Sequence, residues 1–101
     1  INSESEFQEA IGSPTPVLVD FWAEWCAPCK VMLPILEQVS DILPVYKVNV
    51  DDFPELSEGI STIPTMRLYK DGEILKDIIG AKPLPRMMLE FEGFVPKKEG
   101  I

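Results

Sequence analysis

The pattern of apolar and polar positions along the chain predicts alternating helices and strands. Near the N-terminus, a capping box of Ser3 and Glu6 precedes apolar residues at helical spacing, so a first helix is predicted up to Gly12. Residues 17–22 form a nearly continuous apolar run that is typical of a buried strand. Further strands are predicted at residues 45–50, 65–70 and 73–79.

Three more helical segments are predicted between and after these strands. The longest runs from about Cys26 to Leu43, and Pro34 should kink it because proline removes a backbone hydrogen bond. Its apolar positions with helical period are Met32, Leu33, Leu36, Val39 and Leu43. One or two helical turns are expected at 54–58, and a last helix at 83–93 with Met87, Met88 and Phe91 facing inward. Residues 96–101 are expected to form a frayed polar tail.

The predicted order is therefore helix and strand in alternation, closed by a hairpin and a helix. Asp71-Gly72 is a strong signal for a tight hairpin between the last two strands. A parallel pair joined by a helix, followed by an antiparallel hairpin, makes a mixed sheet with helices on both faces. We expect residues 1–101 to form a single α/β domain.

Composition and charge narrow the classes of function. With 46% hydrophobic residues, the chain can build one core. Its net charge of −8 argues against binding to nucleic acid or to an anionic membrane surface. No apolar run approaches the roughly 20 residues of a membrane-spanning helix, and no signal peptide is visible. The first residue is not Met, so a removed leader stays open.

The two cysteines of the chain are the strongest chemical signal. Cys26 and Cys29 have the C-x-x-C spacing, which in a chain of this kind indicates redox chemistry. Cys26 is predicted at a helix N-terminus, where unpaired N–H groups and the helix dipole favour a thiolate. The alternatives are inert thiols or half of a zinc site. A zinc site needs about four ligands, and the chain has no His and no third Cys.

Asp20 is a carboxylate within the apolar run 17–22. Burial there would raise its pKa and let it exchange a proton near neutral pH. The alternative is an outward-facing strand residue that pairs with Lys47.

Over nearly its full length, the chain resembles the thioredoxin family. The matching blocks are Val19-Asp20-Phe21-Trp22-Ala23-Glu24-Trp25-Cys26, Pro28-Cys29-Lys30 with Pro34, Lys47-Val48-Asn49-Val50-Asp51, Ile63-Pro64-Thr65, and Asp71-Gly72 with Gly80-Ala81. It departs from the family at Ala27, where glycine is usual. The family's first edge strand is short or missing, and the segments around the strand that ends at Val50 are shortened.

The resemblance implies a thioredoxin fold and a role for each matching residue. Cys26 would be the exposed cysteine that attacks a target disulfide, and Cys29, more buried, would resolve the mixed disulfide. Asp20 would assist deprotonation of Cys29. Lys47 would be the family lysine beside that carboxylate, or else an ordinary exposed strand residue. The redox group is the cysteine pair, so no cofactor or metal is expected.

The resemblance also implies a docking surface around Cys26. The Ile63–Pro64 bond is expected to be cis, beside the disulfide, with the backbone of Ile63 offered to an extended substrate strand. The expected apolar docking residues are Trp25, Ala27, Pro28, Ile63, Pro64, Ile79, Gly80 and Ala81. The alternative for Ile63 and Ile79 is a place in the core. Trp22 is expected to pack rather than to contact substrate.

The leading hypothesis is a disulfide reductase of target proteins that a thioredoxin reductase keeps reduced. It would act in the cytoplasm as a monomer. One alternative is an extracytoplasmic disulfide oxidase or isomerase, although such relatives commonly carry His where this chain has Pro28. The other is a non-catalytic binding module with a thioredoxin-like fold.

Overall fold

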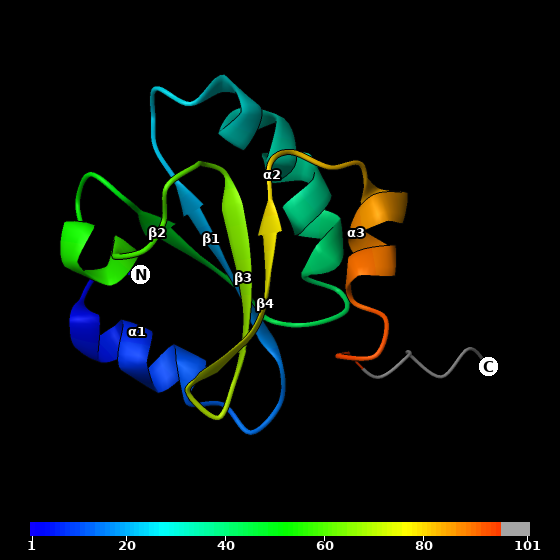
Figure 1. The fold of residues 1–101 in the computed structure, drawn as a ribbon, viewed down its shortest axis with the longest axis horizontal. Coiled ribbons are helices and arrows are strands. Elements are labelled where there is room, and N and C mark those ends of the chain that lie inside the picture. The colour runs from blue at the N-terminus through cyan, green and yellow to red at the C-terminus, as the bar shows by residue number, and fades with distance from the viewer. Residues whose placement is uncertain (96–101) are drawn as a thin grey trace.

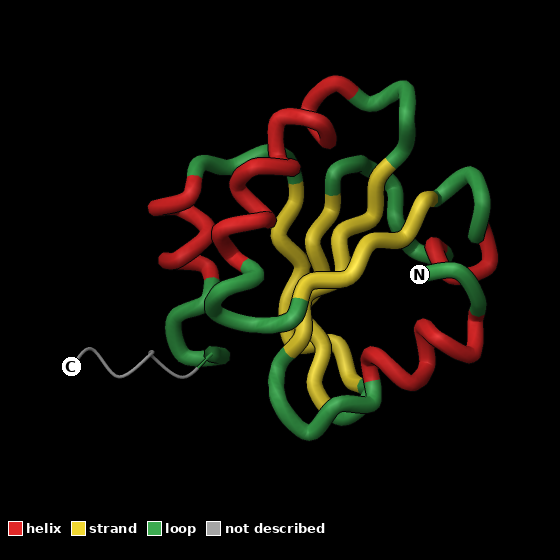
Figure 2. Tube along the Cα trace, turned by 180° about the vertical axis from the view of Figure 1, so that it is seen from behind, coloured by secondary structure: helices red, strands yellow, loops and turns green. Residues whose placement is uncertain are grey.

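A four-stranded mixed sheet lies between helices in the computed structural model, which describes residues 1–95 (Figure 1). The elements in chain order are α1 (Glu4–Ile11), β1 (Val17–Trp22), α2 (Ala27–Val39), β2 (Val45–Asn49), the 3-10 helix η1 (Pro54–Ser57), β3 (Thr65–Lys70), β4 (Glu73–Ile79) and α3 (Leu84–Glu90). Helices α2 and α3 cover one face and α1 lies on the other, as Figure 2 shows from behind. This confirms the predicted fold class; the predicted tail at 96–101 lies outside the described residues.

The strand order is β2-β1-β3-β4, so β1 and β3 are the two inner strands. Strand β1 pairs in parallel with β2 and antiparallel with β3, and β3 pairs antiparallel with β4. At the tight turn between β3 and β4, Asp71 and Gly72 both have positive φ, 54° and 79°, as the hairpin signal predicted. Strand β2 is one edge of the described sheet, where the backbone nitrogen of Ile1 donates to the carbonyl of Lys47 at 3.0 Å.

The alternation of side chains along β1 supplies both hydrophobic layers. Leu18 is fully buried with Met32, Leu36 and Met87 on the α2 and α3 side. On the other side, one buried cluster joins Phe7, Ile11, Val17, Val19, Phe21, Val48 and Tyr69. Because side chains alternate in a strand, Asp20 shares the α2 face of the sheet with Leu18. The sheet therefore holds this carboxyl beneath the helix that carries the cysteines.

The first helix begins as its capping box predicts, with one difference. The Ser3 hydroxyl accepts the N–H of Glu6 at 3.1 Å. The Glu6 carboxylate accepts from the backbone N–H of Asn2, at 3.2 Å, rather than from that of Ser3. Helix α1 then packs its apolar side on the sheet, where the Phe7 ring meets Tyr69 edge-on.

Two predicted helix faces were partly wrong. In α2 the buried stripe is Cys29, Met32, Leu36 and Val39, so Leu33 falls to one side of it and is 43% exposed. In α3 the Met87 side chain is buried but Met88 is exposed, because so short a helix buries one narrow stripe. Helix α2 also ends at Val39 rather than Leu43, since Ser40 caps it and the following turn carries Leu43 back into the core.

Candidate redox site

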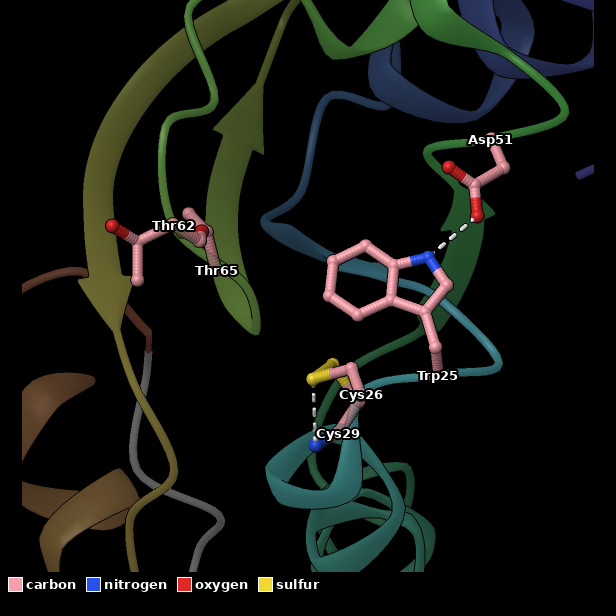
Figure 3. Close-up of a disulfide and its surroundings, with 6 residues drawn as sticks. All are labelled: Trp25, Cys26, Cys29, Asp51, Thr62 and Thr65. Atoms are coloured by element: carbon pink, nitrogen blue, oxygen red, sulfur yellow. Dashed lines mark hydrogen bonds between the residues drawn. A yellow bond between two sulfur atoms is a disulfide. The ribbon is translucent and has the colours of Figure 1, made fainter.

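Cys26 and Cys29 are joined by a disulfide at the N-terminus of α2 (Figure 3). Cys26 is the N-cap residue, with extended backbone, and Cys29 lies in the first helical turn. The Cys26 sulfur accepts the backbone N–H of Cys29 at 3.2 Å. The same N–H can stabilise negative charge on that sulfur once the disulfide opens, because it is one of the helix's unpaired donors.

Both cysteines are buried. Cys26 is 4% exposed and Cys29 is 2% exposed, so the expectation of an exposed Cys26 was wrong for this disulfide state, although Cys29 is the more buried of the two. The pair packs with Ala23, and the partly buried Trp22 and Ile63 close around it. An incoming sulfur therefore has to approach Cys26 over the surrounding side chains, which makes their shape part of the chemistry.

Asp20 is completely buried, and neither of its carboxyl oxygens has a hydrogen-bond partner within residues 1–95. Burial raises the pKa of Asp20 from its ordinary 3.8 to about 7, while the charge of Lys47 acts in the opposite direction. The alternative of an outward-facing Asp20 paired with Lys47 was therefore wrong. An unpaired carboxyl with a pKa near neutrality can release and regain a proton at physiological pH.

A cavity of about 340 Å³ opens beside Cys29, between α2 and the edge strand β2. Its lining residues are Trp22, Glu24, Cys29, Lys30, Leu33 and Lys47. Lys47 thus lies next to the cysteines as part of the cavity wall. Trp22 packs against the cysteines, as expected. The cavity therefore reaches Cys29, whereas Cys26 is not among its lining residues.

The loop before β3 lies against the disulfide. The Ile63–Pro64 bond is cis, as expected, and the Ile63 side chain packs against the cysteines. The Pro64 carbonyl accepts the N–H of Gly80 at 2.8 Å, which ties this loop to the segment after β4. Ile63 itself donates and accepts no backbone hydrogen bond within the described residues. Its N–H and C=O are therefore available to another chain.

Exposed apolar side chains surround this loop. Trp25 is 71% exposed and Ile79 is 55% exposed, so Ile79 is not a core residue. Ala27, Pro28 and Ala81 are exposed, and Ile63 and Gly80 are partly buried. Every residue expected at the docking surface except the buried Pro64 thus offers some surface to solvent. Such a group of exposed apolar residues is typical of an interaction site.

Three contacts around the site were not anticipated. The Trp25 indole N–H donates to the Asp51 carboxylate at 2.8 Å, as Figure 3 shows. The Met32 sulfur accepts the backbone N–H of Lys82 at 3.3 Å, and the Thr65 hydroxyl donates to the Thr62 carbonyl at 2.5 Å. Of these contacts, the sequence could have predicted only the one with Asp51. The parallel strands β1 and β2 end at the same edge of the sheet, and Trp25 and Asp51 follow these two strands there.

Comparison with known proteins decides the family. Residues 1–91 match the family model described as thioredoxin. The chain belongs to the thioredoxin family. It is 46% identical over 87 residues to thioredoxin of Alicyclobacillus acidocaldarius, covering 80% of this chain and 83% of that one. It is 38% identical over 102 residues to the bifunctional thioredoxin reductase/thioredoxin of Mycobacterium leprae, covering 95% of this chain and 22% of that protein.

Solved structures agree with this assignment. The structure of Plasmodium falciparum thioredoxin superimposes with a TM-score of 0.85 at 33% identity, and the match covers 94% of this chain and 97% of that one. Thioredoxins are thiol-disulfide oxidoreductases, and this member carries the cysteine pair that the chemistry requires. The chain is therefore a dithiol-disulfide oxidoreductase whose redox group is its own disulfide. No helix among residues 1–95 is long and apolar enough to cross a membrane.

Proposed function

We propose that the chain reduces disulfides in target proteins, with Cys26 as nucleophile and Cys29 as resolving thiol. The Cys26 thiolate attacks one sulfur of the target disulfide, which forms a mixed disulfide and releases the other target sulfur as a thiolate. The Cys29 thiolate then attacks the Cys26 sulfur and releases the second target sulfur. The target gains two electrons and two protons, and the Cys26–Cys29 disulfide of the structure is the product. The position of the Cys26 sulfur at the α2 N-terminus is the observation that carries this order.

Asp20 is proposed to remove the proton from Cys29 before the second step. The carboxyl lies on the α2 side of the sheet, is unpaired, and has a pKa raised to about 7 by burial. The pKa of a cysteine thiol is ordinarily about 8.5, so a base beneath the helix favours the thiolate at the moment of attack. Lys47 is proposed to act through its charge, which favours the ionised form of Asp20.

Target segments are proposed to dock in extended form on the apolar residues around Cys26. The free N–H and C=O of Ile63 would pair with the target backbone, as in the addition of a strand to a sheet edge. Trp25, Ala27, Pro28, Ile79, Gly80 and Ala81 would pack against the target's side chains, beside Pro64 in the same loop. Backbone pairing with an apolar rim accepts many sequences, which suits a reductase of varied proteins.

The proposed partners follow from the direction of electron flow. A reductase must return two electrons to Cys26 and Cys29 after each cycle, and we propose a thioredoxin reductase in that role. The Mycobacterium leprae relative is named for both activities, which supports this pairing. We further propose that residues 1–101 act as one domain, as a monomer, in the reducing environment of the cytoplasm.

Reduction of insulin with dithiothreitol as electron donor tests the proposal. The wild type should bring on turbidity sooner than dithiothreitol alone, and Cys26→Ser should abolish that acceleration. Cys29→Ser should accumulate a mixed disulfide through Cys26, visible by mass spectrometry. Full activity of Cys26→Ser would contradict the proposal. A Cys26–Cys29 reduction potential near the oxidising end of the thioredoxin-fold range, about −120 mV, would instead favour the oxidase.

A further inference from the structure

A buried threonine is hydrogen-bonded to the peptide group that precedes Ile63. Thr65 is 3% exposed, and its hydroxyl donates to the carbonyl of Thr62 at 2.5 Å. Figure 3 labels the two threonines side by side. Thr62 itself is exposed. The bond reaches back across Ile63 and Pro64 and so closes the loop that lies against the disulfide.

The backbone of Thr65 is a fixed point for this bond. Thr65 is the first residue of β3 and pairs with Phe21 of β1 on one side and with Ile79 of β4 on the other. A residue held between two strands cannot shift without breaking the ladder on both sides. Its hydroxyl therefore holds the Thr62 carbonyl relative to the sheet.

The carbonyl of Thr62 and the N–H of Ile63 belong to one peptide group. A peptide group is planar, so the direction of its carbonyl also sets the direction of its N–H. That N–H makes no backbone hydrogen bond within the described residues. On the other side of Ile63, the Pro64 carbonyl is already held by Gly80 at 2.8 Å. The loop is thus held at two places. Gly80 holds it after Ile63, and the Thr65 hydroxyl holds the peptide group before Ile63, which carries the Ile63 N–H.

We propose that Thr65 is a positioning residue whose hydroxyl orients the Ile63 N–H toward a carbonyl of a docked protein segment. This inference rests on the proposed function, because it assigns a task to the docking loop described there. Thr65 would affect the recognition of a target's peptide backbone and not the thiol-disulfide exchange itself. It should therefore matter for a protein disulfide and not for a small disulfide without a backbone.

The test compares Thr65→Val, which keeps the shape and removes the donor, with Thr65→Ser, which keeps the donor. The substrates are insulin and 5,5′-dithiobis(2-nitrobenzoic acid), which has no peptide group. We expect Thr65→Val to raise the KM for insulin about fivefold, the range that the loss of one hydrogen bond supports, with kcat little changed. The rate with the small disulfide should stay as in the wild type. Thr65→Ser should restore the KM.

The matched control is Thr15→Val, which removes the hydroxyl of an exposed loop threonine at the far end of β1. It should change neither substrate's rate. Thr65→Ala removes the same donor with a smaller side chain and serves if Thr65→Val does not fold. An unchanged KM for insulin in the folded variant would overturn the inference, as would equal losses with both substrates or a failure of Thr65→Ser to restore binding. If the wild type reduces neither substrate, the proposed function fails and the inference with it.

Discussion

Asp20 and Lys47 are direct partners in the parallel register of β1 and β2, yet their side chains form no ion pair within residues 1–95. Asp20 points into the protein and is fully buried, whereas Lys47 is exposed beside the cavity next to Cys29. The lysine therefore acts on the carboxyl only through its field. Burial outweighs that field, and the pKa of Asp20 rises to about 7.

The first prediction concerns stability and pH. An unfolded chain ionises Asp20 near pH 3.8, whereas the folded chain keeps it protonated to about pH 7. The folded state binds the proton more tightly, so the contribution of Asp20 to stability falls as pH rises from 4 to 7. The loss is on the order of 4 kcal/mol above pH 7. Asp20→Asn should remove this pH-dependent loss. The free energy of unfolding of the variant should therefore exceed that of the wild type by several kcal/mol more at pH 8 than at pH 4.

Urea unfolding of the oxidised protein at both pH values measures this difference. Asp52→Asn removes an exposed carboxylate and serves as the control, because it should leave the wild-type pH dependence in place. If Asp20→Asn shows the same change between pH 4 and pH 8 as the wild type, Asp20 does not have a raised pKa in the folded state.

The second prediction concerns the rate of exchange. Asp20→Asn keeps the size of the side chain and cannot accept the proton of Cys29. We expect insulin reduction at pH 7 to slow by about a hundredfold, at the low end of what general-base assistance contributes. Stopped-flow measurement should show that the mixed disulfide forms at nearly the wild-type rate and resolves more slowly. An equal slowing of both steps would point to a general disturbance of the site.

The third prediction uses Lys47. Because its charge lowers the pKa of Asp20, Lys47→Met should move that pKa upward. The pH dependence of insulin reduction should shift to higher pH in this variant, and the activity at high pH should remain. Lys70→Met, on another strand, is the control for the loss of a positive charge. A shift of the profile to lower pH would contradict the assigned sign.

The fourth prediction concerns Trp25. Its exposed ring is held by the hydrogen bond from the indole N–H to Asp51. Asp51→Ala should free the ring, lower its fluorescence anisotropy and raise the KM for insulin a few-fold, with little change in kcat. Asp52→Ala, which alters the next residue, should leave both quantities as in the wild type. Unchanged anisotropy in Asp51→Ala would show that packing rather than this bond holds the ring.

The fifth prediction concerns the residue that departs from the family pattern. Ala27 begins α2, and glycine at a helical position costs up to about 1 kcal/mol relative to alanine. Ala27→Gly should loosen the first turn slightly, shift the Cys26–Cys29 potential by less than about 30 mV and leave insulin reduction intact. Equilibration with a glutathione buffer measures the potential, and a much larger shift would show that Ala27 tunes the redox step.

Local signals in the sequence were enough to predict most of the fold. The continuous apolar run of β1 and the Asp71-Gly72 turn mark their elements without reference to the rest of the chain. The exposed Leu33 and Met88 were missed because a helical period does not say which of two adjacent apolar rows meets the sheet. That choice depends on how α2 and α3 pack, which is a property of the whole structure.

The site divides in the same way. The cysteine pair is visible in the sequence because residue type and spacing carry its chemistry. The role of Asp20 and the cis Ile63–Pro64 bond were expected from the resemblance to the thioredoxin family. The low exposure of Cys26 could not be predicted from the sequence, because it depends on how Ile63 and Trp22 pack around the cysteines. The bond between Thr65 and Thr62 is local in sequence. Its meaning depends on the Ile63 N–H, which has no backbone partner among residues 1–95, and only the folded loop shows this.

The placement of the two tryptophans gives the protein an optical readout of its own chemistry. Trp22 packs against the disulfide, and Trp25 is the neighbour of Cys26 in the chain; the sequence contains no other indole. A disulfide in contact with an excited indole quenches its emission, so opening of the Cys26–Cys29 bond should brighten the intrinsic fluorescence. Electron transfer through this protein can then be followed in real time without a label.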